Sequence, residues 1–104
     1  MTEFLRDTKK AFDIASVTFD EDDRENAVLQ WMRRQAYKVY LENFSGGDKL
    51  LELNSGTGID AFYLGARGIS VHATDISTGM IDALRQKLSV ENSGGMNIIG
   101  ADVL

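Results

Sequence analysis

The second half of the chain alternates short apolar runs with helix-like segments, and this order constrains the fold more than any other feature. The apolar runs cover residues 49–53, 69–75 and 96 onward, and the helical patterns between them cover 56–68 and 77–88. Crossovers of this kind are right-handed and place consecutive parallel strands side by side. The pattern therefore predicts an α/β fold, a Rossmann-like doubly wound parallel sheet with its strands in the order third, second, first.

The first half of the chain predicts two helices. One covers residues 4–15, where apolar and small side chains recur every three or four residues: Phe4, Leu5, Thr8, Ala11, Phe12 and Ala15. The other runs from Glu25 to Phe44 and ends at the glycines of 45–47. One broad stripe of it carries Val28, Trp31, Met32, Gln35, Ala36, Val39, Tyr40 and Phe44. We expect its aromatic side chains to lie in the core.

Charged side chains between and on these helices are expected to be solvated. The consecutive acids Asp20 to Asp23 predict an exposed loop that leads into the second helix. Arg33 and Arg34 are expected to face water. A catalytic carboxylate cluster is the less favoured interpretation of the acids, because consecutive exposed acids are usually just hydrated.

The domain organisation follows from these elements. Residues 1–104 form a single partial domain, with N-terminal helices over 1–46 and a βαβαβ half over 47–104. The first strand, "KLLEL", is apolar on both faces, as a strand inside a parallel sheet should be. In the predicted order this strand lies at an edge. We therefore expect further strands of a larger domain to pair there, or the open edge to support self-association.

Composition excludes several function classes. The net charge is −5, and residues 1–47 carry 9 acids and 7 bases while residues 48–104 carry 7 and 4, so no basic surface for nucleic acid is predicted. The absence of cysteine excludes disulfides, thiolate zinc sites and a cysteine nucleophile, and no metal site is predicted. No apolar stretch approaches the roughly 20 residues of a membrane span. A cytoplasmic protein without membrane contact is expected.

Three features converge where the strands end, which is where doubly wound sheets bind ligands. The first is the glycine-containing loop from Asn54 to Gly58. The second is Asp75, whose carboxylate at the end of the second strand suits the two hydroxyls of a ribose. The third is Asp102, at the end of the third strand, placed to accept a bond from an amino group such as that of adenine. Together they favour a ligand that contains a nucleoside.

Two kinds of cofactor fit a nucleoside site. The run "GTGIDA" satisfies the dinucleotide pattern G-x-G-x-x-G/A, which supports an NAD(P)-dependent oxidoreductase. Against it, two helices precede the strand, and Glu52 stands two residues before the loop, where a pyrophosphate would repel it. An acid there suits a cationic ligand. A non-catalytic nucleoside-binding module is a further alternative.

The residues that carry these features resemble the class I S-adenosylmethionine-dependent methyltransferases, in their N-terminal, cofactor-binding half. The resemblance rests on four stretches: "LLELNSGTGID", "VHATDIS" followed by "MIDAL", "IIGADVL" and the upstream "AFDIASVTFD". Asn54 replaces the first glycine of the family's loop, and Thr78 stands where proline is frequent. Asparagine tolerates a positive φ better than most residues do.

The resemblance implies S-adenosyl-L-methionine as the cofactor and assigns roles along the chain. It places these residues of the first strand and its loop at the methionine end of the cofactor and behind the nucleoside: Glu52, Asn54, Ser55, Gly56, Thr57 and Gly58. Asp75 would bind the ribose, Ile76, Asp102 and Val103 would lie at the adenine, and Phe19 is the aromatic common in the lead-in. His72 is assigned no catalytic role.

Catalytic residues remain unassigned by the resemblance, because the family's acceptor side largely follows the third strand. The methyl acceptor is left open among small molecules, lipids, proteins and RNA, with a small-molecule substrate favoured. These 104 residues alone are expected to be inactive.

Overall fold

The computed structural model describes residues 2–91 and 98–102 of the chain. Its helices are α1 (Glu3–Ala15), α2 (Phe19–Glu25), α3 (Ala27–Asn43), α4 (Ile59–Gly65) and α5 (Thr78–Glu91). Its strands are β1 (Lys49–Glu52), β2 (Ser70–Asp75) and β3 (Ile98–Asp102). The turn predicted at 91–95 lies almost wholly outside the described residues, as does Val103.

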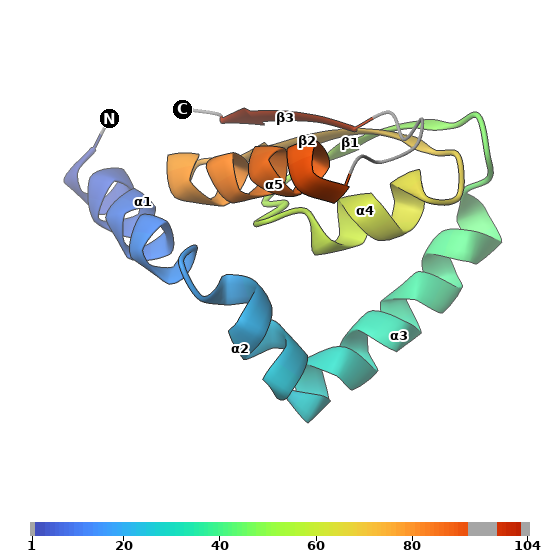
Figure 1. The fold of residues 1–104 in the computed structure, drawn as a ribbon, viewed down its shortest axis with the longest axis horizontal. Helices are drawn as coiled ribbons and strands as arrows, with labels where there is room; N and C mark the ends of the chain where they lie inside the picture. Colours follow the sequence, from blue (N-terminus) through green and yellow to red (C-terminus); the bar gives the residue numbers. More distant parts are fainter. Residues whose placement is uncertain (1, 92–97, 103–104) are drawn as a thin grey trace.

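The three strands form a parallel sheet in the order β1-β2-β3, which confirms the predicted order. The register pairs Glu52 with Ala73 and Asp75 with Asp102, so the carboxyl ends of the strands meet at one edge. Helices α4 and α5 lie against one face of the sheet, and α2 and α3 form a V beyond them (Figure 1). This arrangement is the predicted Rossmann-like parallel sheet with N-terminal helices attached, and its described helices lie on one face.

The core lies between the sheet and the helices α4 and α5. From β2 and the residue before it, Ile69, Val71 and Ala73 point inward and are buried, as their alternation predicts, while His72 points outward and is exposed. The helices contribute Ala61, Leu64, Met80, Ile81 and Leu84. These side chains hold the sheet and the two helices together as one hydrophobic unit.

The opposite face of the sheet carries apolar side chains that remain exposed. Leu51 is 65% exposed and Ile99 is 57% exposed, and Leu53 just beyond β1 is 69% exposed. Among the described elements, none covers this face, which lies uppermost in Figure 1. A parallel sheet normally buries both faces, so this surface is where the fold leaves apolar area accessible.

The acids at 20–23 do not form the predicted exposed loop. They lie in α2, where acids in the first turn complement the helix dipole, and Asp23 is 5% exposed. Asp20 and Asp23 also have partners on other elements, which a pattern of neighbouring residues does not show.

The apolar stripe predicted for α3 divides into two faces. Tyr40 and Phe44 are half-buried and pack against the core, whereas Trp31 is 57% exposed and Met32 is 53% exposed. The expectation that all its aromatic residues enter the core is therefore wrong for Trp31. At about 100° per residue the two pairs lie on opposite sides of the helix, and α3 contacts the body along one side only.

Helices α1 and α2 dock without burying apolar side chains. Thr2 caps α1 by accepting a hydrogen bond from the Leu5 amide at 3.2 Å, yet Phe4 of this helix is 76% exposed. Polar contacts therefore carry the attachment of these two helices. No helix in the described part of the chain is long and apolar enough to cross a membrane.

Candidate functional site

The loop after β1 turns sharply through left-handed backbone conformations. Asn54 has φ 55°, Gly56 has φ 58° and Gly58 has φ 86°. Asn54 therefore adopts the positive φ that asparagine tolerates, in place of the family's glycine. At Gly58 a Cβ atom would lie 2.6 Å from Leu84 Cδ1, so the packing of α5 against the loop leaves room only for glycine.

The backbone amides of this loop are engaged within the protein. The Ser55 amide donates to the Thr74 carbonyl at 2.9 Å, and the Gly58 amide donates to the Ser55 carbonyl at 3.1 Å. The Gly56 amide donates to Asp75 Oδ2 at 2.9 Å. A phosphate-binding loop aims such amides at its ligand. This loop therefore has the turn of a dinucleotide site, but the amides of Ser55, Gly56 and Gly58 are committed to protein oxygen atoms.

Asp75 lies at the meeting point of the two loops. Its Oδ2 accepts from Gly56 and its Oδ1 accepts from the Ser77 amide, each at 2.9 Å. A carboxylate has about four lone-pair sites, so two further bonds to a ligand remain available. The backbone of Asp102 lies beside it in register on β3. The side chain of Asp102 and the residue Val103 fall outside the described part, and their predicted adenine contacts stay predictions.

Glu52 carries a buried carboxylate oxygen, Oε1, which has no hydrogen-bond partner in the described part of the chain. Burial, together with the nearby charge of Asp60, raises the pKa of Glu52 to about 7, and Arg33 opposes this rise. The buried Ser55 Oγ also has no partner among the described residues. Buried polar atoms are nearly always hydrogen-bonded, so two such atoms near one loop indicate a place for a ligand.

Arg33 is the cation whose charge acts on Glu52, and its hydrogen bonds go to other carboxylates. Its guanidinium donates to Asp23 Oδ1 at 2.7 Å and to Asp60 Oδ1 at 2.6 Å, and Tyr37 also donates to Asp60, at 3.0 Å. Burial opposes the ionisation of Asp23, but the hydrogen bonds from Arg33 and Gln30 keep its pKa below the usual range. One guanidinium thus serves two carboxylates and leaves Glu52 without a paired cation.

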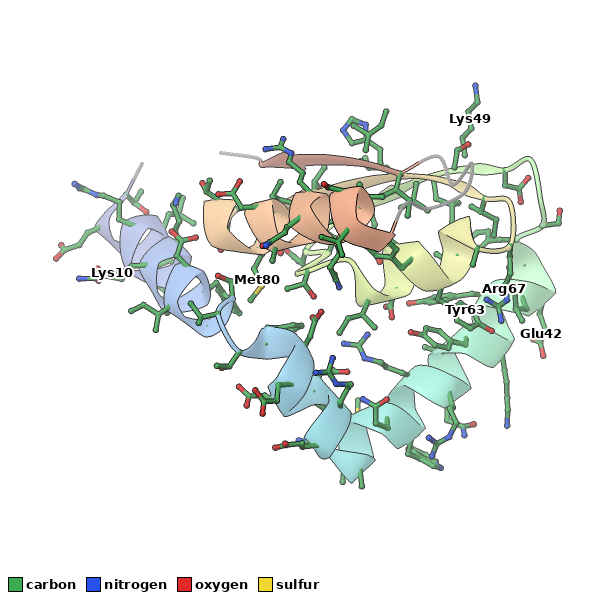
Figure 2. The ribbon with its side chains drawn as sticks, viewed as in Figure 1. Lys10, Glu42, Lys49, Tyr63, Arg67 and Met80 are labelled. Atoms are coloured by element: carbon green, nitrogen blue, oxygen red, sulfur yellow. The ribbon has the colours of Figure 1, made fainter. Side chains whose placement is uncertain are left out.

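This cluster corrects the expectation that Arg33 faces water, and it was missed from the sequence. Its carboxylates come from α2 and α4, so only the tertiary fold brings them to α3. On the other side of Asp60, Tyr37 stacks on Tyr63 with ring centroids 3.7 Å apart, and Arg67 lies 3.6 Å above the Tyr63 ring (Figure 2). The stack of Tyr37 on Tyr63 joins α3 to α4, and Arg67 covers the Tyr63 ring from the residues that follow α4.

Phe19 and Ile76 are half-buried near the two loops. A Cβ atom at Gly56 would lie 3.6 Å from the Phe19 ring, so the first residue of α2 covers the glycine loop. The structure thus brings together most of the predicted residues: Glu52, Asn54, Ser55, Gly56, Thr57, Gly58, Asp75, Ile76 and Phe19. Within the described residues no group of His, Asp and Glu is arranged for a metal ion.

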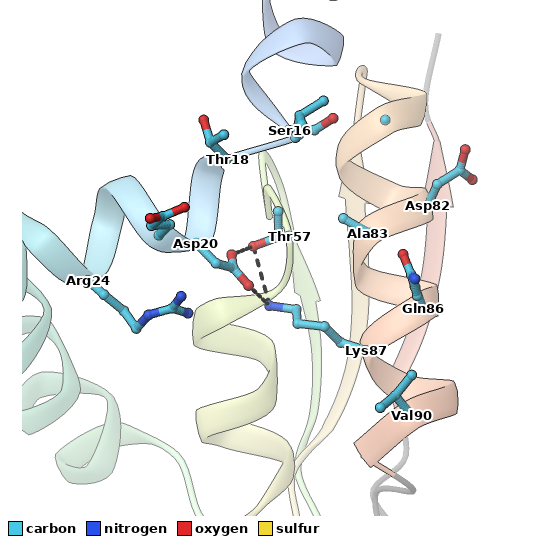
Figure 3. Close-up of a pocket in the computed structure, with 13 residues that line it drawn as sticks. Ser16, Thr18, Asp20, Arg24, Thr57, Asp82, Ala83, Gln86, Lys87 and Val90 are labelled. Carbon is cyan, nitrogen blue, oxygen red and sulfur yellow. Dashed lines mark hydrogen bonds and ion pairs between the residues drawn. The ribbon is translucent and has the colours of Figure 1, made fainter.

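A cleft of about 700 Å³ lies next to this loop, between the α1–α2 segment and α5 (Figure 3). Of the predicted cofactor residues only Thr57 lines it; Asp20, Arg24, Gln86 and Lys87 are other members of its wall. Its contents would therefore contact the back of the loop and the helices rather than Glu52 or Asp75. The carboxylate oxygen of Glu52 without a hydrogen-bond partner among the described residues lies outside this cleft, at the carboxyl end of β1.

Comparison with solved structures identifies the fold. The [4+2]-cyclase SpnF matches over 93% of this chain and 42% of its own, with a TM-score of 0.77 and 13% identity. The DhpI-SAH complex matches over 95% of this chain and 44% of its own, with a TM-score of 0.59 and 21% identity. A TehB-like SAM-dependent methyltransferase from Corynebacterium glutamicum matches over 77% of this chain and 44% of its own, with a TM-score of 0.53 and 20% identity. No protein-family model and no curated protein matches the sequence.

The chain therefore has a class I S-adenosylmethionine-dependent methyltransferase-like fold, as its motifs predicted. It spans less than half the length of each of these three structures. At these identities the likeness establishes the fold, and the function rests on the geometry of the site.

Proposed function

We propose that this chain is the cofactor-binding portion of an S-adenosylmethionine-dependent methyltransferase. The observation that carries the proposal is the buried carboxylate of Glu52, whose Oε1 has no hydrogen-bond partner in the described part of the chain. S-adenosylmethionine brings an ammonium and a sulfonium and no phosphate, so it supplies the positive charge that this site lacks. Burial makes such an ion pair stronger than one at the surface.

Each predicted residue acquires a role in holding the ligand. Glu52 and Ser55 present their buried oxygen atoms to the amino-acid end. Asp75, already oriented by the Gly56 and Ser77 amides, accepts from the ribose hydroxyls. When bound, the cofactor supplies a methyl group on an activated leaving group. The protein then mainly orients the two reactants and excludes water.

The loop argues against a dinucleotide. Three of its amides, from Ser55, Gly56 and Gly58, donate to protein oxygen atoms, so they are not available to a pyrophosphate. A pyrophosphate would also approach the carboxylate of Glu52. An NAD(P)-dependent oxidoreductase is therefore the less favoured proposal.

A second candidate is a nucleoside-binding module that does not transfer methyl groups. SpnF, which shares this fold, is a [4+2]-cyclase, so the fold alone does not specify methyl transfer. The acceptor, the acceptor-side residues and a cytoplasmic location belong to the proposal for the whole protein. A small-molecule acceptor remains the favoured class.

Calorimetric titration of the chain with S-adenosylhomocysteine and, separately, with NAD tests the proposal. We expect S-adenosylhomocysteine to bind and NAD not to bind. Asp75→Ala should weaken binding at least tenfold, whereas Asp82→Ala, which removes an exposed acid from α5, should leave it unchanged. Binding of NAD alone would overturn the methyltransferase proposal.

A second ligand isolates Glu52. 5′-Methylthioadenosine keeps the nucleoside and lacks the amino-acid end. Glu52→Gln should therefore weaken S-adenosylhomocysteine about tenfold and leave 5′-methylthioadenosine unchanged, since a charge-assisted contact is lost in the first ligand only. Equal losses for both ligands would show that Glu52 does not meet the ammonium.

A further inference from the structure

The N-terminal segment formed by α1 and α2 makes hydrogen bonds to both loops of the candidate site, the one after β1 and the one after β2. Asp13 at the end of α1 accepts from Ser77 Oγ at 2.5 Å and from the Gly79 amide at 2.9 Å, which fixes the loop after β2. Asp20 in α2 accepts from the hydroxyl of Thr57, which fixes the loop after β1. The short segment between these two acids thus bridges two loops that follow different strands.

The carboxylate of Asp75 accepts a hydrogen bond from each of the two loops. Ser77, held by Asp13, donates its amide to Asp75 Oδ1, and Gly56, adjacent to the Thr57 that Asp20 holds, donates its amide to Asp75 Oδ2. All of these hydrogen bonds join side chains or backbone amides of the described residues. The carboxylate of Asp75 is therefore bonded to both loops, and each loop is also bonded to one of the N-terminal acids, Asp13 or Asp20.

Lys87 strengthens the contact at Asp20. Its ammonium lies 2.9 Å from Asp20 Oδ2 and 3.4 Å from Thr57 Oγ1, as the dashed lines in Figure 3 show, and 5.1 Å from the centre of the Phe62 ring. Asp20 and Lys87 are only 28% and 23% exposed, so water and salt screen the pair less than a surface pair. The contact joins α2, the glycine loop and α5.

These polar contacts carry an unusual share of the attachment. The buried hydrophobic side chains of the described chain all come from residues 61–98, and within α1 and α2 the buried residue is the acid Asp23. Besides the half-buried Phe19, the segment is held by the polar contacts of Asp13, Asp20 and Asp23. Loss of one such contact should release the segment without unfolding the sheet.

We propose that Asp13 and Asp20 are positioning residues for the nucleoside site: they fasten the N-terminal segment over both loops and hold Asp75 and the glycine loop in the binding geometry. This inference rests on the proposed function of the site. A protein whose binding-competent state is only partly populated binds its ligand more weakly by that fraction. Opening the contact should therefore reduce affinity for any ligand that uses Asp75.

The test compares Asp20→Asn and Lys87→Met with Asp82→Asn, which removes a carboxylate from the same cleft without touching the loop. We expect the first two to weaken both S-adenosylhomocysteine and 5′-methylthioadenosine about five- to tenfold, in line with typical coupling between sites. The double variant should lose no more than either single variant, because both remove one contact. Asp20→Glu should restore part of the affinity.

Hydrogen exchange of the free protein separates this inference from the proposed function. Asp20→Asn should speed exchange of the Ser55, Gly56 and Gly58 amides and leave the β2 amides protected. Unchanged exchange and affinity in both Asp20→Asn and Lys87→Met would overturn the inference, even if only the melting temperature falls. If the wild type binds neither ligand, the proposed function is overturned. If Asp20→Asn nevertheless exchanges the loop amides faster than the wild type does, the role of Asp20 in holding the loop is kept.

Discussion

Glu52 shows how one buried residue links stability to ligand choice. The sequence predicted a functional acid before the loop, and the structure places one of its oxygen atoms out of reach of water and of protein donors in the described chain. The acid is thus poorly solvated when ionised. Such a group costs stability in the free protein and gains a partner when a cation binds.

This cost predicts a dependence of stability on pH. The pKa of Glu52 rises from the model-compound value of 4.5 to about 7, so between these pH values the folded chain holds a proton that the unfolded chain lacks. The free energy of unfolding should therefore fall as pH rises through this window, by no more than about 3 kcal/mol. Urea unfolding at pH 5, 6, 7 and 8 measures it.

The matched variants are Glu52→Gln and Glu42→Gln, the latter on the exposed side of α3. Glu52→Gln should flatten the profile and raise stability at pH 8, and Glu42→Gln should leave the profile as in the wild type. A wild-type profile that is already flat from pH 5 to 8 would show that Glu52 ionises as an ordinary surface acid does.

At Gly58 the structure adds a packing constraint, from Leu84, to the backbone constraint that the sequence pattern indicates. An alanine there would combine a φ of 86° with a Cβ 2.6 Å from Leu84 Cδ1. We expect Gly58→Ala to lower the free energy of unfolding by roughly 2–4 kcal/mol, from strain and overpacking together. Thermal and urea unfolding would measure the loss.

Gly47→Ala is the control for Gly58→Ala. Gly47 has φ 94°, but nothing lies within 4 Å of its added Cβ, so only the backbone strain of about 1–2 kcal/mol applies. Equal losses in the two variants would mean that Leu84 moves aside at no cost.

At the scale of elements, α3 shows the limit of apolar periodicity. Its pattern predicted a helix, which is correct, and one wide buried stripe, which is wrong: Tyr40 and Phe44 meet the core while Trp31 faces away. Periodicity identifies an amphipathic helix, but which part of a wide stripe is buried depends on the element that approaches it. Here the buried side of α3 is the one that carries Tyr37, which stacks on Tyr63 of α4, and Arg33, which pairs with Asp23 and Asp60.

Arg33 is the residue through which α2, α3 and α4 are connected. Arg33→Ala would leave Asp23, which is 5% exposed, and Asp60 without their cation. We expect a loss of about 3 kcal/mol in the free energy of unfolding, since breaking a buried pair strands a charge. The neighbouring Arg34→Ala, on the exposed side, should change stability by no more than about 0.5 kcal/mol.

Urea unfolding of both variants at pH 7 makes the comparison. If Arg33→Ala and Arg34→Ala behave alike, the ion-pair cluster does not hold the helices together. A loss in Arg33→Ala that is recovered in Arg33→Lys would show that charge, rather than the fork geometry of arginine, is what the carboxylates require.

At the scale of the whole molecule, the described helices cover one face of the sheet, and no described element covers the other. The predicted strand order is confirmed, and β1, which carries the exposed Leu51, lies at an edge of the sheet. The described part of the chain corresponds to less than half of each compared structure. Exposed apolar strands of this kind pair with other chains, so self-association through the open edge stays a prediction.

Leu51→Lys tests that prediction. We expect the wild-type chain to associate as its concentration rises, and Leu51→Lys to shift sedimentation toward the monomer, because a lysine on an edge strand opposes pairing. Val90→Lys is the control, since Val90 is 76% exposed on α5, away from the uncovered sheet face. If the wild type remains monomeric at all concentrations, the edge does not act as an interface.

The sequence by itself determined the order of the elements, the parallel sheet, the inward face of β2 and the loop and acids at the strand ends. These follow from local periodicity and from the handedness of crossovers, which depend on near neighbours in the chain. Only the tertiary structure decided that Asp20 reaches Thr57, that Arg33 joins Asp23 to Asp60, and that the Glu52 oxygen is left unpaired. Those contacts connect residues up to 37 positions apart, as Asp20 and Thr57 are, and their energies depend on burial that no local pattern contains.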